Sequence, residues 1–148
     1  MPQSLARILV HLVFSTKNRE PFITPEHRDR TFSYLGGTLN ALQCPTIIVG
    51  GMPDHVHLLF ALSRTLSLSR VAEEVKKESS KWAKSHIDPG FYWQNGYGVF
   101  SVSPSNVETI TEYIARQEHH HRKRTFQEEY RILCHKNGTP IDERYVWD

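Results

Sequence analysis

The sequence predicts an α+β domain with a ferredoxin-like antiparallel sheet in the order β-α-β-β-α-β, helices on one face and further helices at the C-terminus. Three observations predict this fold: an apolar strand near the N-terminus, a pair of apolar strands joined by a tight turn, and a long amphipathic helix after each of these two units. The chain has 148 residues, 39% of them hydrophobic and 23% charged, which suits a single domain spanning residues 1–148 with one buried core.

The strands are predicted from short apolar runs. Residues 7–15 are apolar at almost every position, which is typical of a buried strand. Residues 45–49 and 55–62 are two further apolar runs, and the turn residues between them predict a hairpin. Later in the chain, residues 91–103 contain two short extended pieces around Asn95-Gly96, a dipeptide that favours a second hairpin turn.

The helices are predicted from capping residues and from apolar periodicity. Residues 24–42 and 67–86 each begin with a Thr or Ser that can cap a helix, and each carries an apolar stripe at helical spacing. Two later helices begin with a capping box, which is a Ser or Thr followed three residues on by Glu. These boxes are Ser105 with Glu108 and Thr125 with Glu128.

Composition excludes several classes of protein. Two cysteines, Cys44 and Cys134, are too few for a disulfide framework or a cysteine-based zinc site. No apolar run approaches the ~20 residues that cross a bilayer, so no membrane partner is expected. The first residues lack the pattern of a secretion signal, and we expect a cytoplasmic protein. The net charge of +2 says little about partners, so the distribution of charge matters more.

The most unusual local feature is the triplet His55-Val56-His57, which lies within a predicted strand. Side chains two residues apart in a strand point to the same face, so both imidazoles lie close together. Two neutral imidazoles in this arrangement suit a divalent metal. The same triplet also fits two histidines on a solvated face of the sheet.

Tyr113 and Gln117 are four residues apart on the predicted helix that Ser105 begins, so they share one face. The amide oxygen of Gln117 would suit a hard metal ion as a further ligand. A phenol with a pKa of ~10 becomes a useful nucleophile only when it is positioned and electrostatically assisted. Without such a partner, the same two residues fit a half-buried aromatic side chain and a surface amide.

Two segments resemble the signatures of the single-tyrosine HUH transposases, namely residues 50–59 (GGMPDHVHLL) and residues 113–117 (YIARQ). This family includes small insertion-sequence enzymes and relatives associated with repetitive palindromes. Similar segments elsewhere extend the resemblance from about residue 7 to the end of the chain. These segments are residues 11–17, 79–82, 93–98 and 142–148.

The resemblance implies an enzyme that cuts single-stranded DNA. In that case His55, His57 and Gln117 would hold Mg²⁺ or Mn²⁺, and Tyr113 would attack the scissile phosphorus. The products would be a 5′-phosphotyrosine and a free 3′-OH, which a second strand could rejoin. The family also implies DNA with hairpin ends as the partner, and a homodimer in which the tyrosine helix is shared between subunits.

Residues 116–124 form the densest basic stretch of the chain, and it directly follows the tyrosine. Its cations predict contacts with DNA phosphates, although a solvated helix end would look the same. In this stretch His119–His121 are expected to form a polar helix end rather than metal ligands. The long helix at residues 67–86 resembles the part of family members that grips a DNA hairpin. The predicted DNA-binding residues are Lys76, Lys77, Lys81, Arg116, Arg122, Lys123 and Arg124.

Several other side chains are expected to have structural roles. His11 could line the sheet near the metal, but the expected role is that of a core histidine with a satisfied hydrogen bond. Trp82 is predicted to be a core residue. Trp93, Tyr97 and Phe100 could stack on unpaired bases, but packing on the sheet is the expected use.

Other functions remain open at this level. A non-catalytic nucleic-acid-binding module, or a domesticated transposase, could share the fold. RNA-recognition motifs, however, need aromatic residues on the central strand where this chain carries histidines. Two-histidine phosphoesterases need His-x-Ser/Thr elements that the sequence lacks, and amidohydrolase barrels need ~250 residues.

Overall fold

The computed structural model describes residues 2–148 and contains one four-stranded antiparallel sheet. The strands run in the spatial order β2-β3-β1-β4, which confirms the predicted ferredoxin-like arrangement. Their bounds are β1 Leu9–Ser15, β2 Thr46–Met52, β3 His55–Ala61 and β4 Gly98–Val102.

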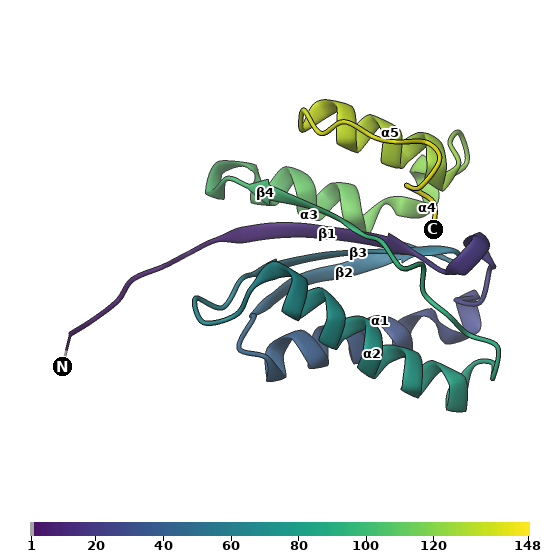
Figure 1. The fold of residues 1–148 in the computed structure, drawn as a ribbon, viewed down its shortest axis with the longest axis horizontal. Coiled ribbons are helices and arrows are strands. Elements are labelled where there is room, and N and C mark those ends of the chain that lie inside the picture. The colour runs from purple at the N-terminus through teal and green to yellow at the C-terminus, as the bar shows by residue number, and fades with distance from the viewer. Residues whose placement is uncertain (1) are drawn as a thin grey trace.

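Helices cover both faces of this sheet, so the molecule has three layers (Figure 1). One face is covered by α1 (Pro25–Ala41) and α2 (Leu68–His86). The other face is covered by the C-terminal helices α3 (Val107–Ala115), α4 (Gln117–His120) and α5 (Phe126–Lys136). Two short 3-10 turns, Lys17–Arg19 and Pro104–Asn106, complete the regular structure.

The two helical layers explain why β1 is apolar on both of its faces. Val10, Leu12 and Phe14 belong to the main core, which packs against α1 and α2. Leu9 and Val13 point the other way and join smaller apolar clusters beneath α3 and α5. Every residue of β1 is buried, and each large apolar side chain buried there contributes about 1.5–3 kcal/mol.

The predicted hairpin at Asn95-Gly96 is wrong. Only β4 forms a regular strand in this region, and Trp93 makes one isolated bridge with Thr16. Side chains satisfy the loop backbone where a hairpin partner would otherwise be needed. The Lys76 Nζ donates to the carbonyls of Asn95 and Gly96, both at 3.0 Å.

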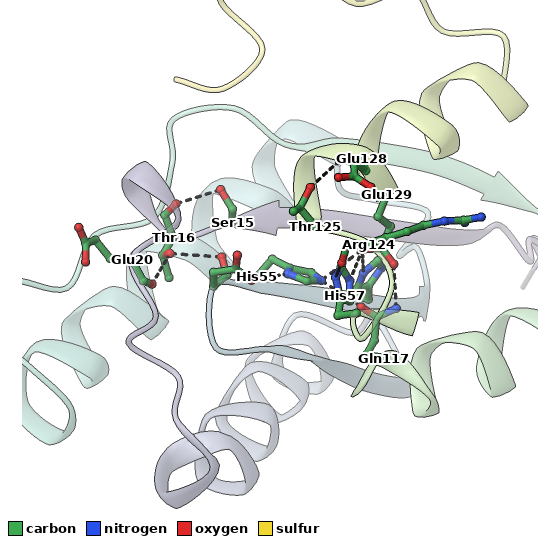
Figure 2. Close-up of polar contacts among 12 residues, drawn as sticks. Ser15, Thr16, Glu20, His55, His57, Gln117, Arg124, Thr125, Glu128 and Glu129 are labelled. Atoms are coloured by element: carbon green, nitrogen blue, oxygen red, sulfur yellow. Dashed lines mark hydrogen bonds and ion pairs between the residues drawn. The ribbon is translucent and has the colours of Figure 1, made fainter. Parts of the chain in front are cut away.

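One of the two predicted capping boxes is also wrong. Ser105 lies inside the 3-10 turn before α3, and its hydroxyl contacts that of Ser103, 3.1 Å away, so it does not cap the helix. The cap residue of α3 is Asn106, one position later. At α5, by contrast, Thr125 Oγ1 accepts a hydrogen bond from the backbone N–H of Glu128 at 3.2 Å, which confirms Thr125 as the cap (Figure 2).

Among the described residues, no helix has the length and apolarity needed to cross a membrane.

A glycine sets the distance between α3 and the sheet. Gly50 of β2 lies directly under Ile114, and a Cβ atom at this position would lie 2.8 Å from both the Cγ2 and the carbonyl oxygen of Ile114. Because Gly50 also pairs with His57 of β3, this close approach fixes α3 beside the histidine pair. Tyr113, the neighbour of Ile114, depends on the same contact for its position.

We therefore predict that Gly50→Ala destabilises the protein by about 1–3 kcal/mol, because the added methyl group must push α3 away from the sheet. A thermal or urea melt measures this change. Gly37→Ala on α1 is the matched control, since a Cβ there meets nothing within 4 Å. That control should stabilise the protein by about 0.5–1 kcal/mol. Equal free energies of unfolding for Gly50→Ala and the wild type would show that this contact does not hold α3.

Candidate active site

Strand β3 delivers two histidines to the face of the sheet that the C-terminal helices cover. His55 and His57 are both fully buried, and their rings lie 5.2 Å apart between centroids. His11 of β1 lies beside them, with its Nε2 2.8 Å from Nδ1 of His57. The two histidines therefore share one face, as the strand alternation predicts, but they are buried rather than solvated. His11 is a buried histidine with a satisfied hydrogen bond, as expected, and because its partner is His57 it also lines the sheet beside the candidate metal site.

Glu129 of α5 is the centre of the site, and the histidine side chains point toward it (Figure 2). Its Oε1 accepts hydrogen bonds from Nε2 of His57 and of His121, both at 3.0 Å. Nε2 of His55 lies 3.2 Å from the same oxygen. Three imidazole nitrogens, two from β3 and one from the segment that follows α4, thus converge on one carboxylate oxygen.

The second oxygen of Glu129 faces the tyrosine. Glu129 Oε2 accepts from the hydroxyl of Tyr113 and, at 3.0 Å, from Nε2 of Gln117. The amide oxygen of Gln117 in turn accepts from Nε2 of His55 at 3.0 Å. The structure therefore brings Tyr113, Gln117 and both strand histidines together within one chain.

Tyr113 and Gln117 reach the site from two helices rather than one. α3 ends at Ala115 and α4 begins at Gln117, so the predicted continuous helix breaks at Arg116. Both side chains still point toward Glu129, because the break is short. The ring of Tyr113 lies 5.8 Å from that of His57 and stacks on His120 at 4.7 Å.

Burial and neighbouring charges shift the pKa values of the titratable groups in the site, often in opposite directions. Burial alone would lower the pKa of His55, but its hydrogen bonds to Asp54 and Glu129 raise it to about 9. Burial lowers the pKa of His11 to about 3, and burial also lowers the pKa of His57. Burial and the negative charge of Glu129 raise the pKa of Tyr113, so its hydroxyl is protonated near neutral pH. The surrounding histidines hold the pKa of Glu129 below its usual range in spite of burial.

The site has the donor atoms that a metal ion needs. Ligand atoms of His55, His121 and Glu129 all lie within 4.8 Å of one another. Metal-binding histidines are usually held by a hydrogen bond at the second ring nitrogen. Here Nδ1 of His55 contacts Asp54 at 2.7 Å, and Nδ1 of His121 contacts the carbonyl of Arg124 at 2.7 Å. This group could therefore bind a metal ion.

Two residues of the site were missed by the sequence reasoning. His121 was expected in a polar helix end, but it turns inward to Glu129, and nothing in its local pattern distinguishes it from His119. Glu129 did leave a signal, because it interrupts the apolar stripe that Phe126 and Tyr130 begin on α5. A buried position occupied by an acid is a candidate functional site.

The predicted DNA-binding residues fall into two groups on opposite layers. Arg122, Lys123 and Arg124 are exposed and line a cavity of about 550 Å³ together with Asp54 and His121. Arg116, also exposed, lies between α3 and α4 in the same layer. Lys76, Lys77 and Lys81 lie on α2, across the sheet from the histidines.

The aromatic residues are mostly structural. Trp93 packs edge-on against Phe14 in the core, and Phe100 is buried on β4, as expected. Trp82 is only half-buried, because it lies at the outer surface of the helical layer, where it stacks between Tyr34 and His86.

The sequence of this chain also matches a known protein family. The family description "Transposase IS200 like" matches residues 4–117, which is most of the chain. The protein belongs to the IS200-like transposase family. No protein of curated function matches the sequence.

Two solved structures share the fold. One is a candidate transposase from Deinococcus radiodurans R1, with 22% identity and a TM-score of 0.65 over 79% of this chain and 95% of that chain. The other is a REP-associated tyrosine transposase bound to a REP hairpin, with 12% identity and a TM-score of 0.60 over 82% of this chain and 73% of that chain. At these identities the likeness establishes the fold.

We predict that Glu129→Gln weakens the binding of Mn²⁺ at least about tenfold, since a neutral amide replaces a carboxylate that three histidines face. Titration calorimetry or the Mn²⁺ spin-resonance signal measures this without any reaction. Glu128→Gln is the matched control, because Glu128 is the exposed neighbour on the same helix. Equal affinities for the two variants would remove Glu129 from the metal site.

Proposed function

We propose that this protein is a metal-dependent transposase that cuts and rejoins single-stranded DNA through a covalent bond to Tyr113. The observation that carries the proposal is the meeting of the Tyr113 hydroxyl and the imidazoles of His55 and His57 at one carboxylate, Glu129. The nucleophile and the metal donors therefore lie next to the same carboxylate group. Membership of the transposase family supports this interpretation.

In the proposed reaction, the Tyr113 oxygen attacks the scissile phosphorus, an O–P bond forms, and the bond to the 3′-oxygen breaks. The phenol must lose its proton as this happens, although burial and the charge of Glu129 raise its pKa. Glu129 Oε2 accepts the hydroxyl hydrogen bond and so orients the phenol, but the lowered pKa of Glu129 makes it a poor base, and the proton passes to solvent water. The released 3′-oxygen gains a proton, and the phosphodiester energy is kept in the 5′-phosphotyrosine. Attack by another 3′-OH reverses these steps and rejoins the DNA.

The proposed metal donors are His55, His57 and Gln117, joined by His121 and Glu129. A divalent ion bound there would polarise a phosphate oxygen and orient the bond to be cut. Three imidazoles suit Mn²⁺ better than Mg²⁺, which prefers oxygen ligands and keeps several waters. We therefore infer Mn²⁺ rather than Mg²⁺ as the ion that this donor set favours.

The basic residues suggest how DNA lies on the protein. Arg122, Lys123 and Arg124 flank the cavity next to His121, where the phosphates of a single strand would meet them. On α2, Lys77 and Lys81 are exposed and suit the backbone of a hairpin, and the REP-hairpin complex of one structural neighbour supports hairpin recognition. Lys76 is half-buried, and its ammonium donates hydrogen bonds to the backbone carbonyls of Asn95 and Gly96. It would therefore hold the loop in place rather than bind a phosphate.

One chain supplies every proposed catalytic group, so the attack of Tyr113 does not require the tyrosine helix of a second subunit. This favours a site completed within each chain over the shared helix that the family resemblance implied. The homodimer itself stays a prediction.

We predict that Tyr113→Phe abolishes a covalent protein–DNA adduct while the protein still binds DNA, because only the attacking oxygen is lost. The measurement is a denaturing gel of labelled single-stranded DNA with a hairpin end, incubated with Mn²⁺. DNA binding by the wild type without any adduct would favour a non-catalytic binding module.

Mixing two inactive variants tests whether the site is complete within one chain. Tyr113→Phe lacks the nucleophile and His57→Ala lacks a metal donor, so a site built within each chain gives no adduct from the mixture. Recovery of the adduct in the mixture would show that the tyrosine and the histidines act from different subunits.

We also predict that replacing Arg122, Lys123 and Arg124 together with Ala flattens the salt dependence of single-strand binding. Each phosphate contact contributes about 0.7 to the slope of log affinity against log salt, so three contacts change it by about 2. Fluorescence anisotropy with a labelled poly-dT strand at several salt concentrations gives this slope. An unchanged slope, with a clear loss for Lys77→Ala/Lys81→Ala instead, would place the single strand on α2.

A further inference from the structure

A cavity of about 360 Å³ lies beside Tyr113, between α3, α5 and the edge strand β4. It is separate from the cavity of the basic residues, which lies at the Met52–Asp54 turn. Tyr113 and His11 border it on the side of the active site. Since His11 contacts His57, this cavity reaches the inner edge of the proposed metal site.

The lining of the cavity combines an apolar wall with a polar rim. Phe100 and Val102 of β4, Ile110 of α3 and Leu133 of α5 contribute the apolar surface. The polar rim consists of Asn106, Thr109, Lys136 and Asn137. An apolar wall combined with two amides and one cation suits a heteroaromatic ring that is attached to a phosphate.

Two rim groups have hydrogen-bonding capacity to spare. Asn106 is the cap residue of α3, but its side chain makes no capping hydrogen bond. Within residues 2–148, Lys136 makes no ion pair. Both side chains can therefore form hydrogen bonds with a ligand in the cavity.

We propose that this cavity binds one nucleobase of the DNA strand being cut, namely that of a nucleotide next to the scissile phosphate. The inference rests on the proposed function, because the phosphate must reach Tyr113 and the adjacent base then lies at the mouth of the cavity. A volume of about 360 Å³ is at the small end of ligand sites and admits one base but no duplex. The base turns out of its stack, packs against the apolar wall, and meets the Asn106 amide at its edge.

A titration with deoxynucleoside 5′-monophosphates tests the site directly. The four nucleotides should shift the backbone amide NMR signals of Ser101, Asn106 and Thr109, while deoxyribose 5-phosphate, which lacks the base, should not. Thr109→Phe fills the cavity from an exposed helix position and should weaken nucleotide binding at least about tenfold. Thr65→Phe, at an exposed threonine in the loop before α2, is the matched control and should bind as the wild type does. Equal shifts from the base-free sugar, or no effect of Thr109→Phe, would overturn the proposal.

A second experiment separates this inference from the proposed reaction. A random single-stranded DNA pool is incubated with the protein and Mn²⁺, and the strands joined to Tyr113 are sequenced. The wild type should enrich one base beside the junction, and Thr109→Phe and Asn106→Ala should still form the adduct but lose that enrichment. Adducts with unchanged enrichment in both variants would overturn the base site and leave the proposed reaction intact. If the wild type forms no adduct, the proposed reaction fails, and the nucleotide titration alone decides the base site.

Discussion

The carboxylate of Glu129, buried among histidines, is the interaction on which the C-terminal half of the structure depends. Removing an ionised carboxylate from water costs several kcal/mol unless charged or polar partners replace the lost hydration. Here the replacement comes from the imidazoles of His55, His57 and His121, the amide of Gln117 and the hydroxyl of Tyr113. These partners come from β3, α3, α4 and the loop before α5. One buried charge thus orients four segments around a single point, where any metal ion and the nucleophile would have to meet.

The sheet makes this arrangement rigid. β1 is buried on both faces, so His11 has no solvent partner, and it hydrogen-bonds His57 instead. Gly50 lies opposite His57 on the neighbouring strand. Because Gly50 has no side chain, α3 packs closely against β2 at Ile114. Tyr113 is therefore held by backbone packing below it and by Glu129 beside it. A nucleophile fixed in this way loses little conformational entropy when a phosphate arrives.

The sequence predicted those side-chain arrangements that depend only on neighbouring residues of one strand or helix. Strand alternation placed His55 and His57 on one face, and helical spacing placed Tyr113 near Gln117, because these relations span only two to four residues. Glu129 lies 72 residues from its partner His57, so no periodicity connects them. Its one signal was an acid within the apolar stripe of α5. The loop at Asn95-Gly96 was misjudged for a similar reason, since its backbone is satisfied by Lys76, which comes from a distant helix.

The two basic surfaces lie on opposite layers of the sheet, yet the fold connects them at one end. The Thr16 N–H donates to the carbonyl of Asp54 at 2.8 Å, and the Gln94 N–H donates to that of Ser15 at 2.9 Å. The end of β1, the turn before His55 and the loop that Lys76 holds therefore meet at this end. Under the proposed function, a hairpin on α2 would pass its single strand around this end to reach Arg124 and then Tyr113. Recognition of duplex DNA and chemistry on single-stranded DNA would then use different layers, and the thickness of the sheet would set the length of strand between them.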